Sequence, residues 1–136
     1  MDVFEGKGLM VGGLRFLTPL EANEILAARR ALLVDLREDY LVAMKRFLAP
    51  DVICIRHDQV ATLSATVPQD RALILADSAG VHTKDAARYL KSQGYGNVAC
   101  LNGGMLAWDQ AGMPVATDTG ALLHGDCACV MKPTSS

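Results

Sequence analysis

The chain has 136 residues, of which 51% are hydrophobic and 21% are charged, and its formal net charge at pH 7 is −2. This length suits one compact domain with its own core. The interspersed charges exclude the basic stripe of a nucleic-acid binder and the polybasic patch of a membrane-surface protein, and no apolar stretch approaches the roughly 20 residues of a membrane span.

The first predicted elements are a short strand and a helix. The apolar stretch Leu14–Leu17 suits an edge strand. Thr18 is a natural helix N-cap, Pro19 fits the first helical position, and Glu21 completes a capping box. The side chains expected to face inward from this helix are Leu20, Ala22, Ile25 and Leu26.

The middle of the chain alternates apolar runs with helical patterns. The predicted elements are a strand over Leu32–Leu36, a helix over Asp39–Leu48, a strand over Val52–Ile55, a short helical connection over 58–67 and a strand over Ala72–Ala76. The helix over Asp39–Leu48 is expected to end near Pro50, because proline interrupts a helix.

The last third repeats the alternation. A helix is predicted over Thr83–Gln93, with Gly94 as its stop, followed by a strand over Val98–Leu101 and a helix over Met105–Ala111. Residues 117–136 lack periodicity and are predicted to form a tail.

These short apolar strands show no two-sided alternation, which is typical of a parallel sheet covered on both faces. The fold class is therefore α/β, with a mostly parallel central sheet and helices on both faces. Ligands of such sheets bind beyond the carboxyl ends of the strands. Three strand exits are the candidate region: residues 35–38, 77–83 and 102–104.

These three exits resemble the rhodanese-like domain family. The first reads Asp35-Leu36-Arg37-Glu38, where the family commonly has D-x-R-x. The loop 77–83 stands where the family has C-x-x-G-x-R-S. Residues 101–114 read LNGGMLAWDQAGMP and match the family pattern L-x-G-G-x-x-A-W-x-x-x-G-x-P. The resemblance implies a single rhodanese-like domain over residues 14–116 and a separate tail over 117–136.

The resemblance also implies an altered anion loop. The nucleophilic cysteine of the family falls on Asp77, its loop arginine on His82 and the following serine on Thr83. The loop as a whole comprises Asp77, Ser78, Ala79, Gly80, Val81, His82 and Thr83. A carboxylate cannot hold the persulfide that carries sulfur. We therefore expect a non-catalytic binding or regulatory module without a cofactor, whose ligand is a protein partner or a sulfur-containing small molecule.

Three interpretations of Asp77 stay open. In the first, its carboxylate folds into the loop and accepts the backbone N–H groups that hold an anion in such a cradle. In the second, Asp77 is a simple N-cap of the helix that follows. In the third, it is a nucleophile for phosphoryl transfer, which also needs a metal and a second acid. His82 is either a pH-sensitive partner of Asp77 or an ordinary surface histidine.

Other residues of the three exits have structural interpretations. Asp35 and Arg37 are expected to form an ion pair that orders the neighbouring loop, and Trp108 is expected to anchor the last helix in the core.

The four cysteines fall into two groups. Cys54 and Cys100 lie in apolar strands and are expected to be buried, whereas Cys127 and Cys129 lie in the tail. This distribution favours a reducing compartment over a disulfide framework, and residues 1–13 lack the pattern of a signal peptide. The predicted location is the cytoplasm.

The tail leaves two further functions open. Cys127 and Cys129 form a C-x-C pair that suits sulfur transfer, sulfur carriage or a redox response. With His124 they also form a weak candidate metal site, since structural zinc usually takes four protein ligands. The remaining alternative is an incidental pair of thiols in a surface tail.

Overall fold

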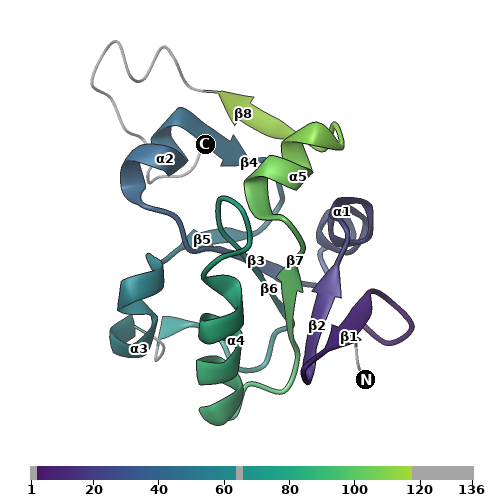
Figure 1. The fold of residues 1–136 in the computed structure, drawn as a ribbon, viewed down its shortest axis with the longest axis vertical. Coiled ribbons are helices and arrows are strands. Elements are labelled where there is room, and N and C mark those ends of the chain that lie inside the picture. The colour runs from purple at the N-terminus through teal and green to yellow at the C-terminus, as the bar shows by residue number, and fades with distance from the viewer. Residues whose placement is uncertain (1–2, 64–65, 118–136) are drawn as a thin grey trace.

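The computed structural model describes residues 3–63 and 66–117. A six-stranded sheet runs through the middle of this fold in the order β1-β2-β7-β6-β3-β5 (Figure 1). Its strands are β1 (Leu9–Val11), β2 (Leu14–Leu17), β7 (Val98–Leu101), β6 (Leu73–Ala76), β3 (Leu32–Asp35) and β5 (Val52–Cys54). A second, two-stranded sheet pairs β4 (Lys45–Phe47) with β8 (Val115–Thr117).

The central sheet is mostly parallel, as predicted. Parallel pairing joins β2 to β7, β7 to β6, β6 to β3 and β3 to β5, and only β1 runs antiparallel to its neighbour. The prediction that Leu14–Leu17 is an edge strand is wrong. The three residues of β1 pair with this strand and take the edge position instead, and their side chains are exposed.

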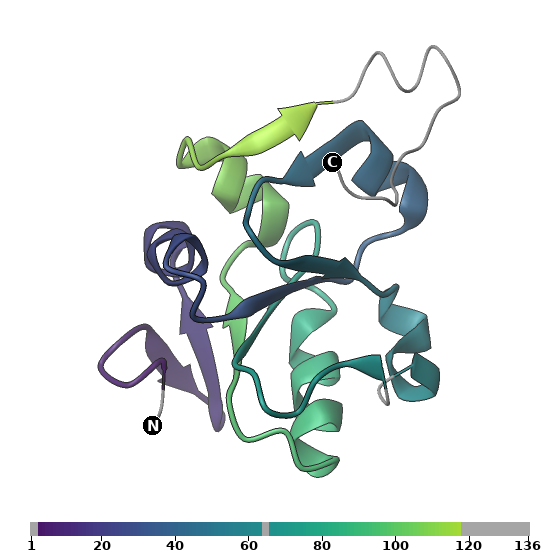
Figure 2. The same ribbon diagram turned by 180° about the vertical axis from the view of Figure 1, so that it is seen from behind.

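Helices cover both faces of this sheet, and strand side chains alternate between two hydrophobic clusters. Helices α1 (Pro19–Ala27) and α5 (Gly104–Gln110) pack into one cluster, and α3 (Val60–Leu63) and α4 (Thr83–Ser92) flank the other (Figures 1 and 2). Phe4, which precedes the first predicted strand, is also buried in the first cluster. Trp108 is the predicted anchor: it is fully buried, and its ring meets that of Phe47 edge to face at 5.3 Å.

Helix α1 begins with the predicted capping box. The N–H of Glu21 donates to Thr18 Oγ1 at 3.2 Å, and the N–H of Thr18 donates to Glu21 Oε1 at 3.0 Å. The N–H of Gly8 donates to the same carboxylate at 3.0 Å. These backbone donors lower the pKa of Glu21 below its usual value. The expected burial of Leu20 is wrong: its side chain is 57% exposed, because it lies on the face of α1 turned away from the sheet.

The end of α1 carries backbone strain at Arg29, whose φ of 59° is left-handed. The N–H of Arg29 donates to the carbonyl of Leu26, and that of Arg30 donates to the carbonyl of Ile25, as in a Schellman motif. We expect Arg29→Gly to raise the free energy of unfolding by about 1 kcal/mol, because glycine adopts this φ without a Cβ penalty. Denaturant unfolding measures this gain. Arg30→Gly is the control, since its φ is not positive, and it should lower stability; equal effects of both variants would contradict the argument.

The predicted helix over Asp39–Leu48 is wrong in its second half. Helix α2 ends at Met44 and the chain continues as β4, which pairs with β8 in the register Lys45↔Thr117. The guanidinium of Arg37 also accounts for the early end, because it donates to the carbonyls of Leu41 and Lys45. The residues that end α2 early, Arg37 and those of β8, thus lie outside the predicted helix. Strand β8 also includes Thr117, the first residue of the predicted tail.

A short turn before α3 completes the described chain. Residues His57–Gln59 form a 3-10 turn, η1, which leads directly into α3. None of the helices in residues 3–63 and 66–117 is long and apolar enough to cross a membrane.

Candidate binding site at the loop after β6

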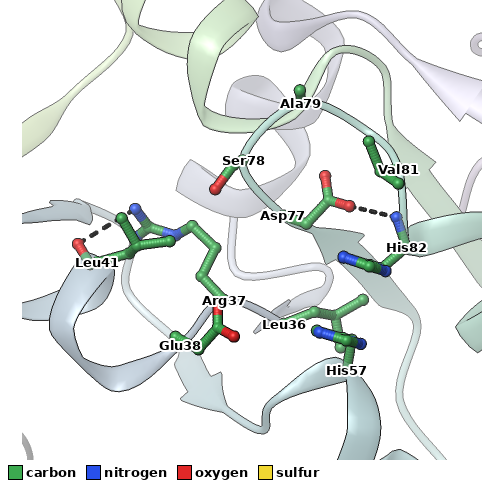
Figure 3. A pocket seen from close by; sticks show the side chains of 10 residues that line it. All are labelled: Leu36, Arg37, Glu38, Leu41, His57, Asp77, Ser78, Ala79, Val81 and His82. Atoms are coloured by element: carbon green, nitrogen blue, oxygen red, sulfur yellow. Dashed lines mark hydrogen bonds between the residues drawn. The ribbon is translucent and has the colours of Figure 1, made fainter.

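The loop between β6 and α4 wraps around the carboxylate of Asp77. The N–H of Gly80 donates to Oδ1 of Asp77, and the N–H of His82 donates to Oδ2 at 2.5 Å (Figure 3). The side chain of Asp77 is buried, with 2% of the residue exposed. The predicted N–H bonds from the loop to this carboxylate are therefore confirmed.

The N-cap interpretation of Asp77 is wrong. The cap position of α4 is His82, and its side chain makes no capping hydrogen bond. Asp77 lies five residues earlier and bonds the N–H of the cap residue itself, together with one N–H inside the loop. Its carboxylate thus closes the loop and does not serve the first turn of the helix.

The start of α5 supports this loop from behind. The N–H of Met105 donates to the carbonyl of Asp77 at 2.7 Å, and the N–H of Leu106 donates to the carbonyl of Ser78 at 3.0 Å. Gly104 has φ +60° and is buried against the loop backbone. A close approach of this kind requires glycine, because a Cβ would overlap the loop.

The predicted ion pair forms on the other side of the loop. Arg37 contacts the Asp35 carboxylate through Nε and Nη2, the latter at 2.8 Å, and both residues are buried. The guanidinium of Arg37 also lies 5.2 Å from the ring centre of Phe47. All of its nitrogen atoms thus have partners within the fold, which leaves Arg37 in a structural role at the wall of the site.

A pocket of about 150 Å³ opens in front of Asp77. We call it the loop pocket; it is lined by Leu36, Arg37, Glu38, Leu41, His57, Asp77, Ser78, Ala79, Val81 and His82 (Figure 3). Residues of the first two predicted strand exits, 35–38 and 77–83, meet here. The third exit, residues 102–104, supports the loop without lining the pocket.

The strand exits of the sequence analysis did not include two residues of this site, Leu41 and His57. His57 is the one with a titratable side chain. Its imidazole stacks on that of His82, with ring centres 3.6 Å apart and planes within 2° (Figure 3). The N–H of His57 donates to the carbonyl of Leu36 at 3.0 Å, which fixes its backbone beside the end of β3. No local pattern marks His57, because its partner is 25 positions away in the sequence. The side chain of His82 thus stacks on His57, whereas the bond from His82 to Asp77 is made by its backbone N–H.

The last loop residue, Thr83, begins α4 and is 1% exposed. Its Oγ1 is buried and makes no hydrogen bond within the described part of the chain. Its backbone carbonyl accepts a hydrogen bond from Cys100 Sγ at 3.7 Å.

Of the two cysteines in the described residues, only Cys100 is buried. Burial raises the pKa of the Cys100 thiol to about 11, the bond to Thr83 lowers it and the charge of Asp77 raises it further. A thiol with this pKa is almost wholly protonated at neutral pH and is a poor nucleophile. The expected burial of Cys54 is wrong: it is exposed, because β5 is the outermost strand of the sheet.

The candidate residues of the tail, His124, Cys127 and Cys129, lie outside the described residues. Within residues 3–63 and 66–117, no group of three or more His, Cys, Asp or Glu side chains has a geometry that holds a metal ion. The loop pocket contains a second carboxylate besides Asp77, that of Glu38, so phosphoryl transfer at Asp77 stays a prediction that nothing in the described residues tests.

The sequence matches a known family model and is similar to proteins named as sulfurtransferases. The family model described as "Rhodanese-like domain" matches residues 18–111. A protein of Allochromatium vinosum named "Sulfurtransferase" is 32% identical over 89 residues, which are 65% of this chain and 81% of that protein. A thiosulfate sulfurtransferase (GlpE) of Actinobacillus succinogenes is 27% identical over 104 residues, which are 76% of this chain and 92% of that protein.

Solved structures show the same fold. A rhodanese-related protein of Thermoplasma volcanium superposes with a TM-score of 0.68 at 19% identity, over 75% of this chain and 97% of that one. A rhodanese-like domain protein of Staphylococcus aureus superposes with a TM-score of 0.62 at 24% identity, over 70% of this chain and 91% of that one.

Proposed function

We propose that this chain, which belongs to the rhodanese-like domain family, is a non-catalytic binding or regulatory module at the loop where relatives of that family hold their nucleophile. The observation that carries the proposal is the carboxylate of Asp77, which is buried and accepts the N–H groups of its own loop. The resemblance assigns Asp77 to the position of the family cysteine.

The chemistry of a carboxylate supports this proposal. Sulfur transfer between a donor and an acceptor proceeds through a thiolate that becomes a persulfide and is released again. An oxygen nucleophile has no equivalent intermediate. Cys100, whose thiol donates to the carbonyl of the loop residue Thr83, does not replace it, because this thiol is buried and its pKa of about 11 keeps it protonated.

The charges around the loop pocket support the same proposal. Asp77 and Glu38 contribute two carboxylates to its lining, and the positive charge of Arg37 is paired with Asp35. An anion such as thiosulfate therefore meets a negative wall and a loop in which the N–H groups of Gly80 and His82 are already bonded to Asp77. A neutral imidazole at His82 attracts anions less than a permanently charged guanidinium does.

The test is a thiosulfate:cyanide assay of the wild-type protein, with intact-mass detection of the gain of about 32 Da that a persulfide adds. We expect neither thiocyanate formation nor a mass adduct. The thiosulfate sulfurtransferase of Actinobacillus succinogenes, assayed in parallel, controls for the reagents. Thiocyanate formation by the wild-type protein that persists in a variant without Cys127 and Cys129 would contradict the proposal.

The variant Asp77→Cys is the matched test of the loop. It restores a thiol in the same cradle, and we expect a persulfide to appear at position 77 while turnover stays well below that of the relative, because His82 and Glu38 remain. A folded Asp77→Cys protein without any adduct would show that the cradle itself no longer binds a sulfur donor.

A second function, sulfur transfer or carriage by Cys127 and Cys129, rests on where the described chain ends. Thr117 pairs with Lys45 next to α2, and Leu41 of that helix lines the loop pocket. Ten residues reach up to about 35 Å when extended, so the distance does not prevent Cys127 from reaching the pocket. A persulfide that maps to the tail and is lost in Cys127→Ala or Cys129→Ala would favour this function, and stoichiometric zinc in the purified protein would favour a metal-binding tail instead.

A further inference from the structure

The stacked pair of His57 and His82, which we call the histidine pair, stands between two hollows of the surface. One is the loop pocket. The other, of about 260 Å³, is the side pocket, lined by His57, Val60, Ala61, His82, Asp85, Ala86 and Tyr89. Both histidines line both pockets, so the pair lies where the two pockets adjoin.

We propose that the histidine pair is a pH-dependent partition: its rings stay stacked while at least one is neutral, and they separate and join the two pockets when both are protonated. This inference goes beyond the proposed function, because it concerns access to the loop pocket and holds whether or not the loop transfers sulfur.

The geometry of the stack makes it sensitive to charge. A neutral imidazole stacks well on another ring or on a cation. Two imidazolium rings with centres 3.6 Å apart repel each other. When water screens the charges fully, this repulsion shifts the equilibrium between stacked and separated rings by about tenfold or less. Partial burial of the rings makes the shift larger. Histidine is the side chain whose charge ordinarily changes between about pH 5 and 8.

The surrounding charges give each protonated ring a separate partner. The titratable and charged groups that face the pair are Arg37, Glu38 and Asp77 in the loop pocket, Asp85 and Tyr89 on α4, and Arg56 and Asp58 beside His57. Arg37 is neutralised by Asp35, and Arg56 by Asp58, at 3.2 Å. The carboxylate of Glu38 lines the loop pocket, and that of Asp85 lines the side pocket. Two protonated rings are therefore attracted to carboxylates in different pockets while they repel each other.

The backbone limits the response to the side chains. The N–H of His57 is bonded to Leu36, and the N–H of His82 is bonded to Asp77. Both main-chain anchors are independent of the imidazoles. Parallel ring planes also direct the ring nitrogens side by side and not toward one point, which disfavours a shared metal ion as the role of the pair.

The experiment is a nuclear Overhauser measurement between the two imidazoles of the full-length protein at pH 7.5 and pH 5. We expect the inter-ring cross-peak of the wild-type protein to fall by up to about tenfold at pH 5, the size of the repulsion between two screened charges at this separation. The matched control is His57→Phe, which keeps a flat ring over His82 and removes one charge; its inter-ring cross-peak should persist at pH 5.

Two results would overturn the inference. One is a wild-type cross-peak that is unchanged at pH 5. The other is a loss of equal size in His57→Phe, which would place the acid response outside the pair. Sulfur transfer does not enter this measurement, so its outcome is independent of the assay of the loop.

Discussion

The variant Gly104→Ala is expected to lose about 3–5 kcal/mol of the free energy of unfolding, the largest effect of any substitution considered for this protein. A Cβ at this position would overlap the carbonyl oxygen of Asp77 and lie 2.8 Å from the carbonyl carbon of Ser78 and 2.9 Å from the nitrogen of Ala79. All three atoms are backbone, so no side-chain rotation relieves the contact. The loop or α5 must move, and both are held by the bonds of Met105 and Leu106.

Gly112→Ala is the control for this prediction. Gly112 has a left-handed φ of +76°, comparable with the +60° of Gly104, but a Cβ there meets nothing within 4 Å. We expect it to cost only the conformational strain, about 1–2 kcal/mol. Denaturant unfolding of both variants isolates the contact between α5 and the loop, and equal losses would show that this contact does not matter.

The second large effect is expected from Asp77→Ala, which should lower the free energy of unfolding by about 2–4 kcal/mol. The substitution removes a charged acceptor and leaves the N–H groups of Gly80 and His82 without their partner in a partly buried loop. The amide hydrogen exchange of these two groups should accelerate together with the loss of stability, because local opening governs exchange.

Two variants bracket this result. Ser78→Ala changes the exposed neighbour of Asp77 and should stay within about 0.5 kcal/mol of the wild-type protein. Asp77→Asn keeps one oxygen acceptor and should fall between wild type and Asp77→Ala. A stable Asp77→Ala protein with slow exchange at Gly80 and His82 would contradict the closing role of the carboxylate.

These two predictions connect the fold to the proposed function. In a rhodanese-like loop the N–H groups are available to an external anion, and here Asp77 accepts two of them. If the loop loses both stability and N–H protection when Asp77 is removed, the carboxylate serves as an internal anion. The site would then have exchanged anion binding for a closed loop, with the loop pocket left for a different ligand.

The sequence by itself determined the parts of this protein that depend on local or motif signals. The capping box of Thr18 and Glu21 needs only residues three positions apart, and it forms as predicted. The apolar runs at residues 32–36, 72–76 and 98–101 need burial on both faces, which the interior of a parallel sheet provides. The spacing of the loop and of the Gly-Gly motif identified the family.

Only the tertiary structure decided the features that join distant parts of the chain. Helix α2 ends at Met44 because β8 arrives from about 70 positions away to pair with β4, and the edge position of β5 exposes Cys54. His57 enters the site only by stacking on His82. Such contacts are invisible to periodicity and propensity, because both describe neighbours in sequence, whereas pairing and packing depend on which surfaces the folded chain brings together.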